Sequence, residues 1–335
     1  MAGRTQHAAM GLSLGIILAR VAAAGGGESP ATTVTALPAP ILEEHRYRMS
    51  AAIRPLFFWI RARDVGAARI IWRSAGDGRR GYELLIGSDP RRAPRRINRW
   101  GWAREDADPS GATMVGVMRK TDEESLSEAA SRIAGEAGGG SFLFKAIRAR
   151  VANGVARAEN TVFRLTSDYT YHELDEVLRM AGSAPRSAPR VRQAAVREGT
   201  RPGFLSALAE LVRQGVGADG PVSGRGPLAG RSLPYTFNAG MYDLRLRAAE
   251  WLEAATYGGR RYERLLRMRF DSYNRELRTH ERFTLVCGTE GRWAGVPVFI
   301  EYQPKWWFKA DGVLDETEVF DDDATHPTAA AGGRE

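Results

Sequence analysis

The sequence predicts a mainly β fold (β-rich α+β), a curved antiparallel sheet or half-open barrel with a few inserted helices. The first indication is an alternation of apolar and polar residues with period two, which is typical of strands that have one buried face. The second is Asn153-Gly154, which stands between two β-like segments; this pair is a strong hairpin signal because both residues tolerate positive φ. The alternation recurs in four segments, at 242–248, 266–270, 283–287 and 298–303.

The N-terminal part of the domain reads as a three-stranded meander. Residues 53–61, 68–73 and 82–87 are rich in β-branched and aromatic side chains. Asp64-Val65-Gly66 indicates a turn or bulge between the first two of these segments. Pro55 places the first strand at an edge or makes it begin late.

A charged and proline-containing loop is expected at 89–110, and it holds Trp100 and Trp102. Because the two tryptophans are spaced two apart, they fit one face of a short strand that packs over the sheet. The alternative is an exposed aromatic platform. A further strand is expected at 112–119.

Helices are expected in three places. Thr121 and the acidic residues after it favour a helix through Glu136. Residues 171–180 form the second, capped by Ser167, Asp168 or Thr170. The third is an amphipathic helix at 203–216, whose apolar stripe is formed by Phe204, Leu208, Leu211 and Val212. The last two helices lie in a helical and loop insertion at about 168–232.

The ends of the chain differ in composition from its middle. Residues 1–24 combine Arg4, a short apolar run and a small-residue pattern, which is the layout of a secretory signal peptide. An uncleaved anchor is the alternative. The expected organisation is a signal peptide at 1–24, a flexible lead at 25–45, one β-rich domain at 46–316 and a disordered acidic tail at 317–335. The mature protein would be exported, periplasmic or outer-envelope associated, without a transmembrane span.

The charge and the reactive residues narrow the function classes. The 335-residue chain carries a formal net charge of +8, but its arginines are scattered, so no nucleic-acid partner is expected. Cys287 is the only cysteine and stands in an apolar strand-like run, which predicts a buried, inert thiol. The histidines lack metal-ligand spacing, and no G-x-S-x-G motif is present after residue 24, beyond the predicted signal peptide. We therefore expect no metal or cofactor and identify no catalytic residue.

Trp306-Trp307-Phe308 is the most suggestive cluster for ligand contact. If these residues continue a strand, Trp307 points to one face while Trp306 and Phe308 point to the other. Exposed aromatic rings beside polar groups are a common way to hold sugars or lipid chains. The alternative is a two-sided core covered by the 121–136 helix. The candidate ligand-binding residues are Trp307, Trp306, Phe308, Trp100, Trp102 and Tyr302.

Glu301 and Asp311 flank the tryptophan pair and are the best-placed carboxylates for a hydrolytic site. Salt bridges to Lys305 or Lys309 would account equally well for the presence of these two carboxylates.

Short motifs stand in two parts of the chain, at 50–88 and 230–316. They are Phe57 to Ile60, Val65-Gly66, Ala68 to Trp72, Tyr82 to Ile86, Phe237 to Tyr242 and Ala294 to Ile300. In these motifs the chain resembles an uncharacterised family of exported bacterial envelope proteins, a β-rich domain of unknown function. The resemblance implies a curved antiparallel sheet in the cell envelope and assigns no catalytic residues.

Three functions follow from these observations. The first is a non-enzymatic exported envelope protein that binds a lipid, a glycan or a partner protein on a concave sheet face. The second is a secreted hydrolase that uses Glu301 or Asp311. The third is a structural scaffold without a ligand, which predicts a barrel interior filled with side chains.

Overall fold

The structure is a computed structural model that describes residues 40–54, 58–74, 80–108, 111–119, 142–217 and 229–319. The predicted signal peptide, the 121–136 helix, most of the lead and nearly all of the tail lie outside these residues.

The described residues form fourteen strands, two α-helices and three short 3₁₀-helices. The helices are α2 (Leu174–Ala181) and α3 (Phe204–Val216), and the 3₁₀-helices are η2 (Pro94–Arg96), η3 (Tyr171–Glu173) and η4 (Gly291–Trp293). The strands are β1 (Ile41–Ile53), β2 (Ile60–Ser74), β3 (Arg80–Ser88), β4 (Trp100–Asp108), β5 (Gly111–Arg119), β6 (Phe142–Ala152), β7 (Val155–Leu165), β8 (Arg190–Ala195), β9 (Ser232–Phe237), β10 (Gly240–Tyr257), β11 (Arg260–Asn274), β12 (Thr279–Gly288), β13 (Pro297–Lys305) and β14 (Phe308–Val319).

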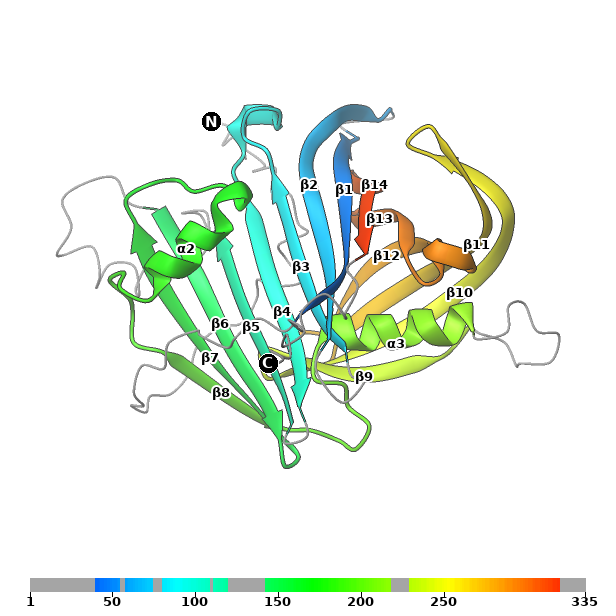
Figure 1. The fold of residues 1–335 in the computed structure, drawn as a ribbon. Coiled ribbons are helices and arrows are strands. Elements are labelled where there is room, and N and C mark those ends of the chain that lie inside the picture. The colour runs from blue at the N-terminus through cyan, green and yellow to red at the C-terminus, as the bar shows by residue number, and fades with distance from the viewer. Residues whose placement is uncertain are drawn as a thin grey trace, which may run out of the picture.

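All fourteen strands of the described residues belong to one antiparallel sheet. Its order is β8-β7-β6-β5-β4-β3-β2-β1-β14-β13-β12-β11-β10-β9, so almost every neighbour in the sheet is also a neighbour in the sequence. The exception is β1, which pairs with β14 and joins the two halves of the chain. Figure 1 shows the sheet bending round on itself without closing. The predicted curved antiparallel sheet is confirmed.

β8 and β9, the two end strands of the sheet, do not pair with each other, but other contacts join the two ends. Arg201 makes a parallel bridge to Tyr235 of β9, and the Thr236 N–H donates to the Arg201 carbonyl. The Asn160 amide of β7 donates to the Asn238 side chain across 2.6 Å. The two ends of the sheet therefore lie close together, and the fold is barrel-like.

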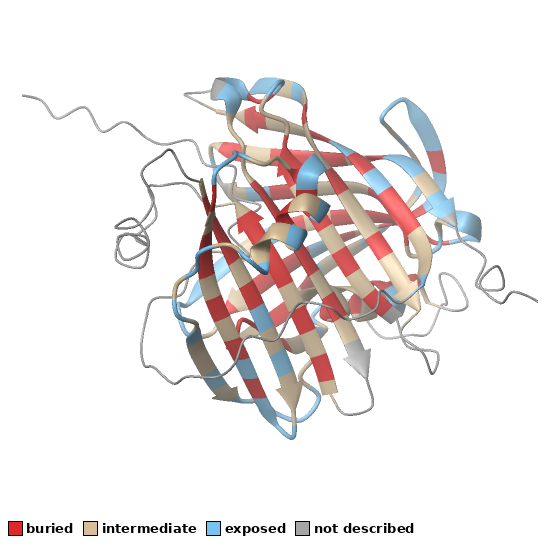
Figure 2. Cartoon of the chain, turned by 60° about the vertical axis from the view of Figure 1, so that its left-hand side comes forward, coloured by how far each residue is buried: buried red, intermediate tan, exposed pale blue. Residues whose placement is uncertain are grey.

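The two α-helices lie on opposite faces of this sheet (Figure 1). α2 packs on the convex face, where Trp102 belongs to its apolar cluster. Successive strand residues alternate in direction, so Glu105, three residues further along β4, points to the concave face. That face carries α3. Figure 2 shows buried and less buried residues alternating along the strands that α2 crosses.

The concave face is filled by α3 and the side chains around it. Leu211 of α3 packs with Leu266 and Met268 of β11, all fully buried. Met114 of β5 joins the same cluster, so α3 connects the two arms of the curved sheet. The amphipathic pattern predicted for 203–216 is confirmed, and its apolar stripe faces this core.

Several local predictions are confirmed. Asn153 and Gly154 adopt φ angles of 50° and 74° and turn β6 into β7. Asp64 has a φ of 52° beside a register shift between β1 and β2, which is the bulge that Asp64-Val65-Gly66 indicated. The predicted helix at 171–180 is present as η3 and α2, and Thr170 caps it together with Glu173.

Four boundaries differ from the predictions. β1 begins at Ile41, so the last residues of the predicted lead are strand, and β14 extends to Val319, beyond the predicted end of the domain. The insertion contains a further strand, β8, which pairs with β7. Most of the second half of the predicted loop at 89–110 is β4, which pairs on both sides. Strand pairing across the sheet overrides the charged local composition in each case.

Candidate functional site

Trp306 and Trp307 form the turn between β13 and β14. Lys305 pairs with Phe308, which leaves the two tryptophans as a two-residue connection. The prediction that they continue a strand, with Trp306 and Phe308 on one face, is therefore wrong. Because β13 ends at Lys305, the strand alternation no longer applies to them, and the pair lies at one end of the sheet.

The connection between β1 and β2 lies beside this turn. Ile53, the last residue of β1, pairs with Ile60 on one side and with Phe308 on the other. The Arg54 N–H donates to the Trp307 carbonyl across 2.7 Å. The chain around Phe58 is thus held next to the tryptophan turn, although it is distant in sequence.

Four exposed apolar side chains lie on these two connections and on the first residue of β2. Their exposed fractions are 61% for Phe58, 39% for Trp59, 49% for Ile60 and 66% for Trp306. Together with the half-buried Trp307 they are called the aromatic end below. Large apolar side chains that gather on a surface mark contact sites far more often than single ones do. The other exposed large apolar residues of the described chain are Val155, Trp251 and Leu277.

The aromatic end rests on a packed core. Phe308 is buried and belongs to a cluster with Tyr47 and Val298. Trp307 lies edge-on to Phe308, with ring centroids 6.1 Å apart. Phe308, a predicted ligand-binding residue, thus supports the turn from within.

Tyr302, another predicted ligand-binding residue, belongs to the concave core. It is buried with Phe283 and Leu285, and its hydroxyl donates to Glu281 across 2.7 Å. Burial raises the pKa of this phenol above its ordinary value, and the nearby Glu281 carboxylate raises it further. The phenol therefore stays protonated and acts as a fixed donor.

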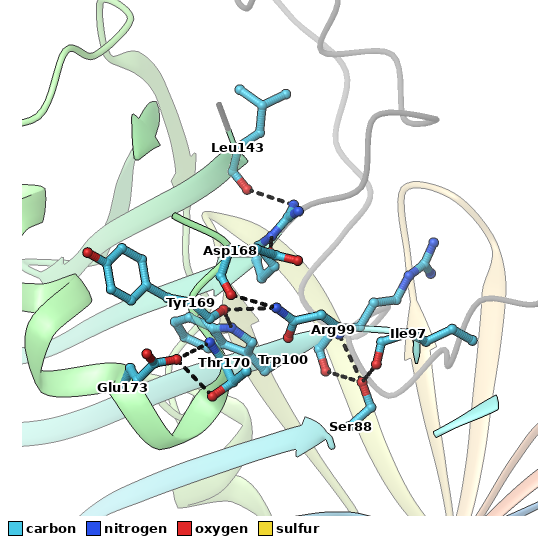
Figure 3. Close-up of polar contacts among 11 residues, drawn as sticks. Ser88, Ile97, Arg99, Trp100, Leu143, Asp168, Tyr169, Thr170 and Glu173 are labelled. Atoms are coloured by element: carbon cyan, nitrogen blue, oxygen red, sulfur yellow. Dashed lines mark hydrogen bonds and ion pairs between the residues drawn. The ribbon is translucent and has the colours of Figure 1, made fainter. Parts of the chain in front are cut away.

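Trp100 and Trp102 are in a different environment from the residues of the aromatic end. Both are buried on the convex face under α2, as the interpretation of one packed strand face predicted. The Trp100 Nε1–H donates to the Tyr169 carbonyl across 2.8 Å (Figure 3), and the Trp102 Nε1–H donates to Glu83 across 2.9 Å. Both indoles are satisfied inside the fold.

Glu301 and Asp311 pair across β13 and β14 and share one lysine. Lys309 Nζ lies 2.7 Å from Glu301 and 3.6 Å from Asp311, and Arg61 lies 2.6 Å from Asp311. Burial raises the pKa of Asp311, while the Lys309 and Arg61 charges act against that rise. The salt-bridge interpretation, through Lys309, accounts for both carboxylates.

Cys287 is the one cysteine of the chain, and its thiol is enclosed in the core. Cys287 is fully buried, and burial raises the pKa of its thiol above the ordinary range, so it stays protonated. Within the described ranges, no three His, Cys, Asp or Glu side chains gather in a way that could hold a metal ion. No helix in the same ranges is long and apolar enough to cross a bilayer.

Glu105 is a buried carboxylate that no sequence pattern marks as special. From the concave face of β4 it accepts the Leu205 and Ser206 backbone N–H groups, each at 2.8 Å, and the Ser206 hydroxyl at 2.9 Å. It therefore caps the first turn of α3, where a negative charge is favourable. A Cβ on Gly203 would lie 2.1 Å from the Glu105 carboxyl carbon, so glycine permits this approach.

Sequence reasoning also missed Phe58, Trp59 and Ile60. The run Ile53 to Arg61 was read as one strand because of its β-branched and aromatic residues, although Pro55 stands inside it. The structure divides the run between the end of β1, a connection and the start of β2. A proline inside a run otherwise typical of a strand was the signal that the run does not continue as one strand.

Comparisons with known proteins give little further information. No family model matches the chain, and no curated protein matches it. Among solved structures, it is similar to the crystal structure of a beta-barrel-like protein of the domain of unknown function DUF1849 from Brucella abortus. The two are 8% identical with a TM-score of 0.36, and the alignment covers 85% of this chain and 100% of the other.

Proposed function

We propose that this chain is an exported, non-enzymatic envelope protein that binds its partner with the aromatic end. The observation that carries the proposal is the exposure of Phe58, Trp59, Ile60 and Trp306, which lie on two adjacent connections and at the start of β2. Exposed aromatic rings on a packed support are typical of recognition surfaces.

The concave face is less suited to this role than the sequence alone implied. α3 occupies it, and the side chains of both sheet arms pack against the helix. A ligand there would have to displace buried leucines and the Glu105 cap of α3. The end of the sheet offers apolar area without such a cost.

The non-enzymatic part of the proposal is supported by the state of the residues considered for catalysis. Glu301 and Asp311 are ion-paired with Lys309, and Cys287 is a buried, protonated thiol. General acid–base or nucleophilic chemistry needs such groups accessible to a substrate. Export itself is supported by the signal-peptide layout of residues 1–24.

Association with the envelope tests this function. The full chain is mixed with an isolated bacterial envelope fraction, and the sedimented share is measured for the wild type and for Phe58→Ala/Trp306→Ala. We expect the double variant to lose most of its association while its melting temperature is unchanged. Leu277→Ala, which alters an apolar side chain that is 48% exposed in the β11–β12 connection, is the control. Equal association of the double variant and the wild type would contradict the proposal.

A further inference from the structure

We infer that the partner of the aromatic end is the surface of a lipid bilayer that carries anionic headgroups. The inference rests on the proposed function and specifies its partner. Three observations support it: the kind of side chains at the aromatic end, the charge of the segments around them, and the core on which they rest.

The side chains are those that enter the interfacial layer of a bilayer. Trp59 and Trp306 combine an apolar ring with an N–H donor, and such rings favour the headgroup level. Phe58 and Ile60 add purely apolar area, which favours the acyl boundary below it. They lie on two connections and at the first residue of β2, all at one end of the sheet, so a shallow insertion reaches them without unfolding a strand.

The charge at this end favours an anionic surface. The two segments 50–64 and 301–311 contain five basic and three acidic residues, a net charge of +2. Glu301 and Asp311 are neutralised by Lys309 and Arg61, while Arg63 is exposed. Without the predicted signal peptide, which holds Arg4 and Arg20, the exported chain keeps 46 basic and 40 acidic residues, and this net charge of +6 adds long-range attraction to anionic headgroups.

The support makes the surface preorganised. The hydrogen bond from Arg54 to Trp307 joins the two connections, and Phe308 anchors the turn in the core. A surface that is already ordered loses little conformational entropy on binding. Arg61, which follows Ile60 in β2, pairs with Asp311 and so adds a charged group close to the apolar side chains, where it can meet the headgroups.

Vesicle flotation with the full chain tests the inference. The vesicles contain phosphatidylcholine alone or with about 30% phosphatidylglycerol, which supplies the anionic surface potential. We expect flotation with the anionic vesicles and a fall of at least about fivefold between about 0.05 M and about 0.5 M salt, because salt screens the attraction.

Two tryptophans of equal exposure provide a matched pair of variants. Trp59 and Trp251 are each 39% exposed, but only Trp59 belongs to the aromatic end. Trp59→Ala is expected to lower binding to the anionic vesicles about fivefold or more, as interfacial tryptophans act as anchors. Trp251→Ala is expected to leave it unchanged.

The outcomes separate the inference from the function on which it rests. Absent flotation, or equal losses for Trp59→Ala and Trp251→Ala, overturns the lipid partner. If Trp59→Ala then still weakens association with the envelope fraction, the aromatic end binds a glycan or a protein, and the proposed function survives. If the envelope association is also unchanged, both are contradicted.

Discussion

Two tryptophan pairs, similar in sequence, lie in opposite environments. Trp100 and Trp102 are 3% and 6% exposed on β4, and both indole N–H groups donate inside the fold. Trp306 is 66% exposed in the β13–β14 turn. The first pair is spaced two apart on one strand face, so a single helix, α2, covers both residues. The second pair is adjacent at a strand end, where no such face exists.

Strand position, rather than aromatic content, decides whether each of these tryptophans is buried or exposed. β4 lies between β3 and β5, presents Trp102 to α2 on one face and presents Glu105 to α3 on the other. The β13–β14 turn contributes Trp306 to the surface only. Substitutions on β4 should therefore change stability, and substitutions in the turn should change binding.

The largest expected effect on stability is that of Trp102→Ala. It removes a buried indole and leaves the Glu83 carboxylate without one donor. We expect the free energy of unfolding to fall by about 3–5 kcal/mol, the usual cost of such a cavity. Urea denaturation measures it, with Trp251→Ala as the exposed control. A loss no greater than that of the control would contradict the core assignment of this pair.

A smaller loss is expected for Glu105→Gln, which keeps the side-chain volume. The amide has one acceptor oxygen where the carboxylate has two, so part of the α3 cap is lost. We expect the free energy of unfolding to fall by about 1–3 kcal/mol. The same urea titration measures it, and the comparison is Glu210→Gln, which changes a half-buried carboxylate of α3 that pairs with Arg213 rather than capping the helix. If Glu105→Gln unfolds at the same urea concentration as the wild type, the Glu105 contacts do not secure α3.

The difference in free energy of unfolding between the wild type and Glu105→Gln, called the deficit below, should also depend on pH. Burial raises the pKa of Glu105 above 4.5, although the hydrogen bonds from Leu205 and Ser206 act against that rise. Since the folded pKa is above the unfolded one, the carboxyl favours folding most below about pH 4.5, and this contribution is lost as the pH rises through the folded value. The deficit should shrink with rising pH in that range. Unfolding titrations at several pH values check this, and a growing deficit would show that the pKa is lowered.

Trp306→Ala should have the smallest effect on stability. Its ring is mostly in solvent and belongs to no buried cluster. We expect a change within about 0.5 kcal/mol, as for most surface positions. Thermal unfolding measures the change, and a drop in melting temperature comparable to that of Trp102→Ala would show that the turn is part of the core.

Much of the fold could be predicted from the sequence because its signals are local. The alternation in 242–248 and 283–287 specifies half-buried strands, and Asn153-Gly154 specifies a turn through its backbone conformation. The stripe on α3 specifies a helix with one buried face. None of these requires knowledge of a distant partner.

The remaining features depend on contacts between distant residues. Glu105 caps a helix a hundred residues later, and no local pattern marks a carboxylate for that task. β8 and β4 are strands because neighbouring strands pair with them, although their own composition is charged. The aromatic end arises because β1 pairs with β14, which places Phe58 beside Trp306. From the sequence, Trp306 could be proposed as a contact residue, but its partners could not.

The most direct test compares Trp59→Ala and Trp251→Ala in envelope association and thermal unfolding measured on the same samples. We expect both variants to melt within about a degree or two of the wild type, since each ring is largely at the surface. We also expect only Trp59→Ala to lose association with the envelope fraction. Equal association for the two variants, at equal melting temperatures, would contradict the claim that the aromatic end is the binding surface.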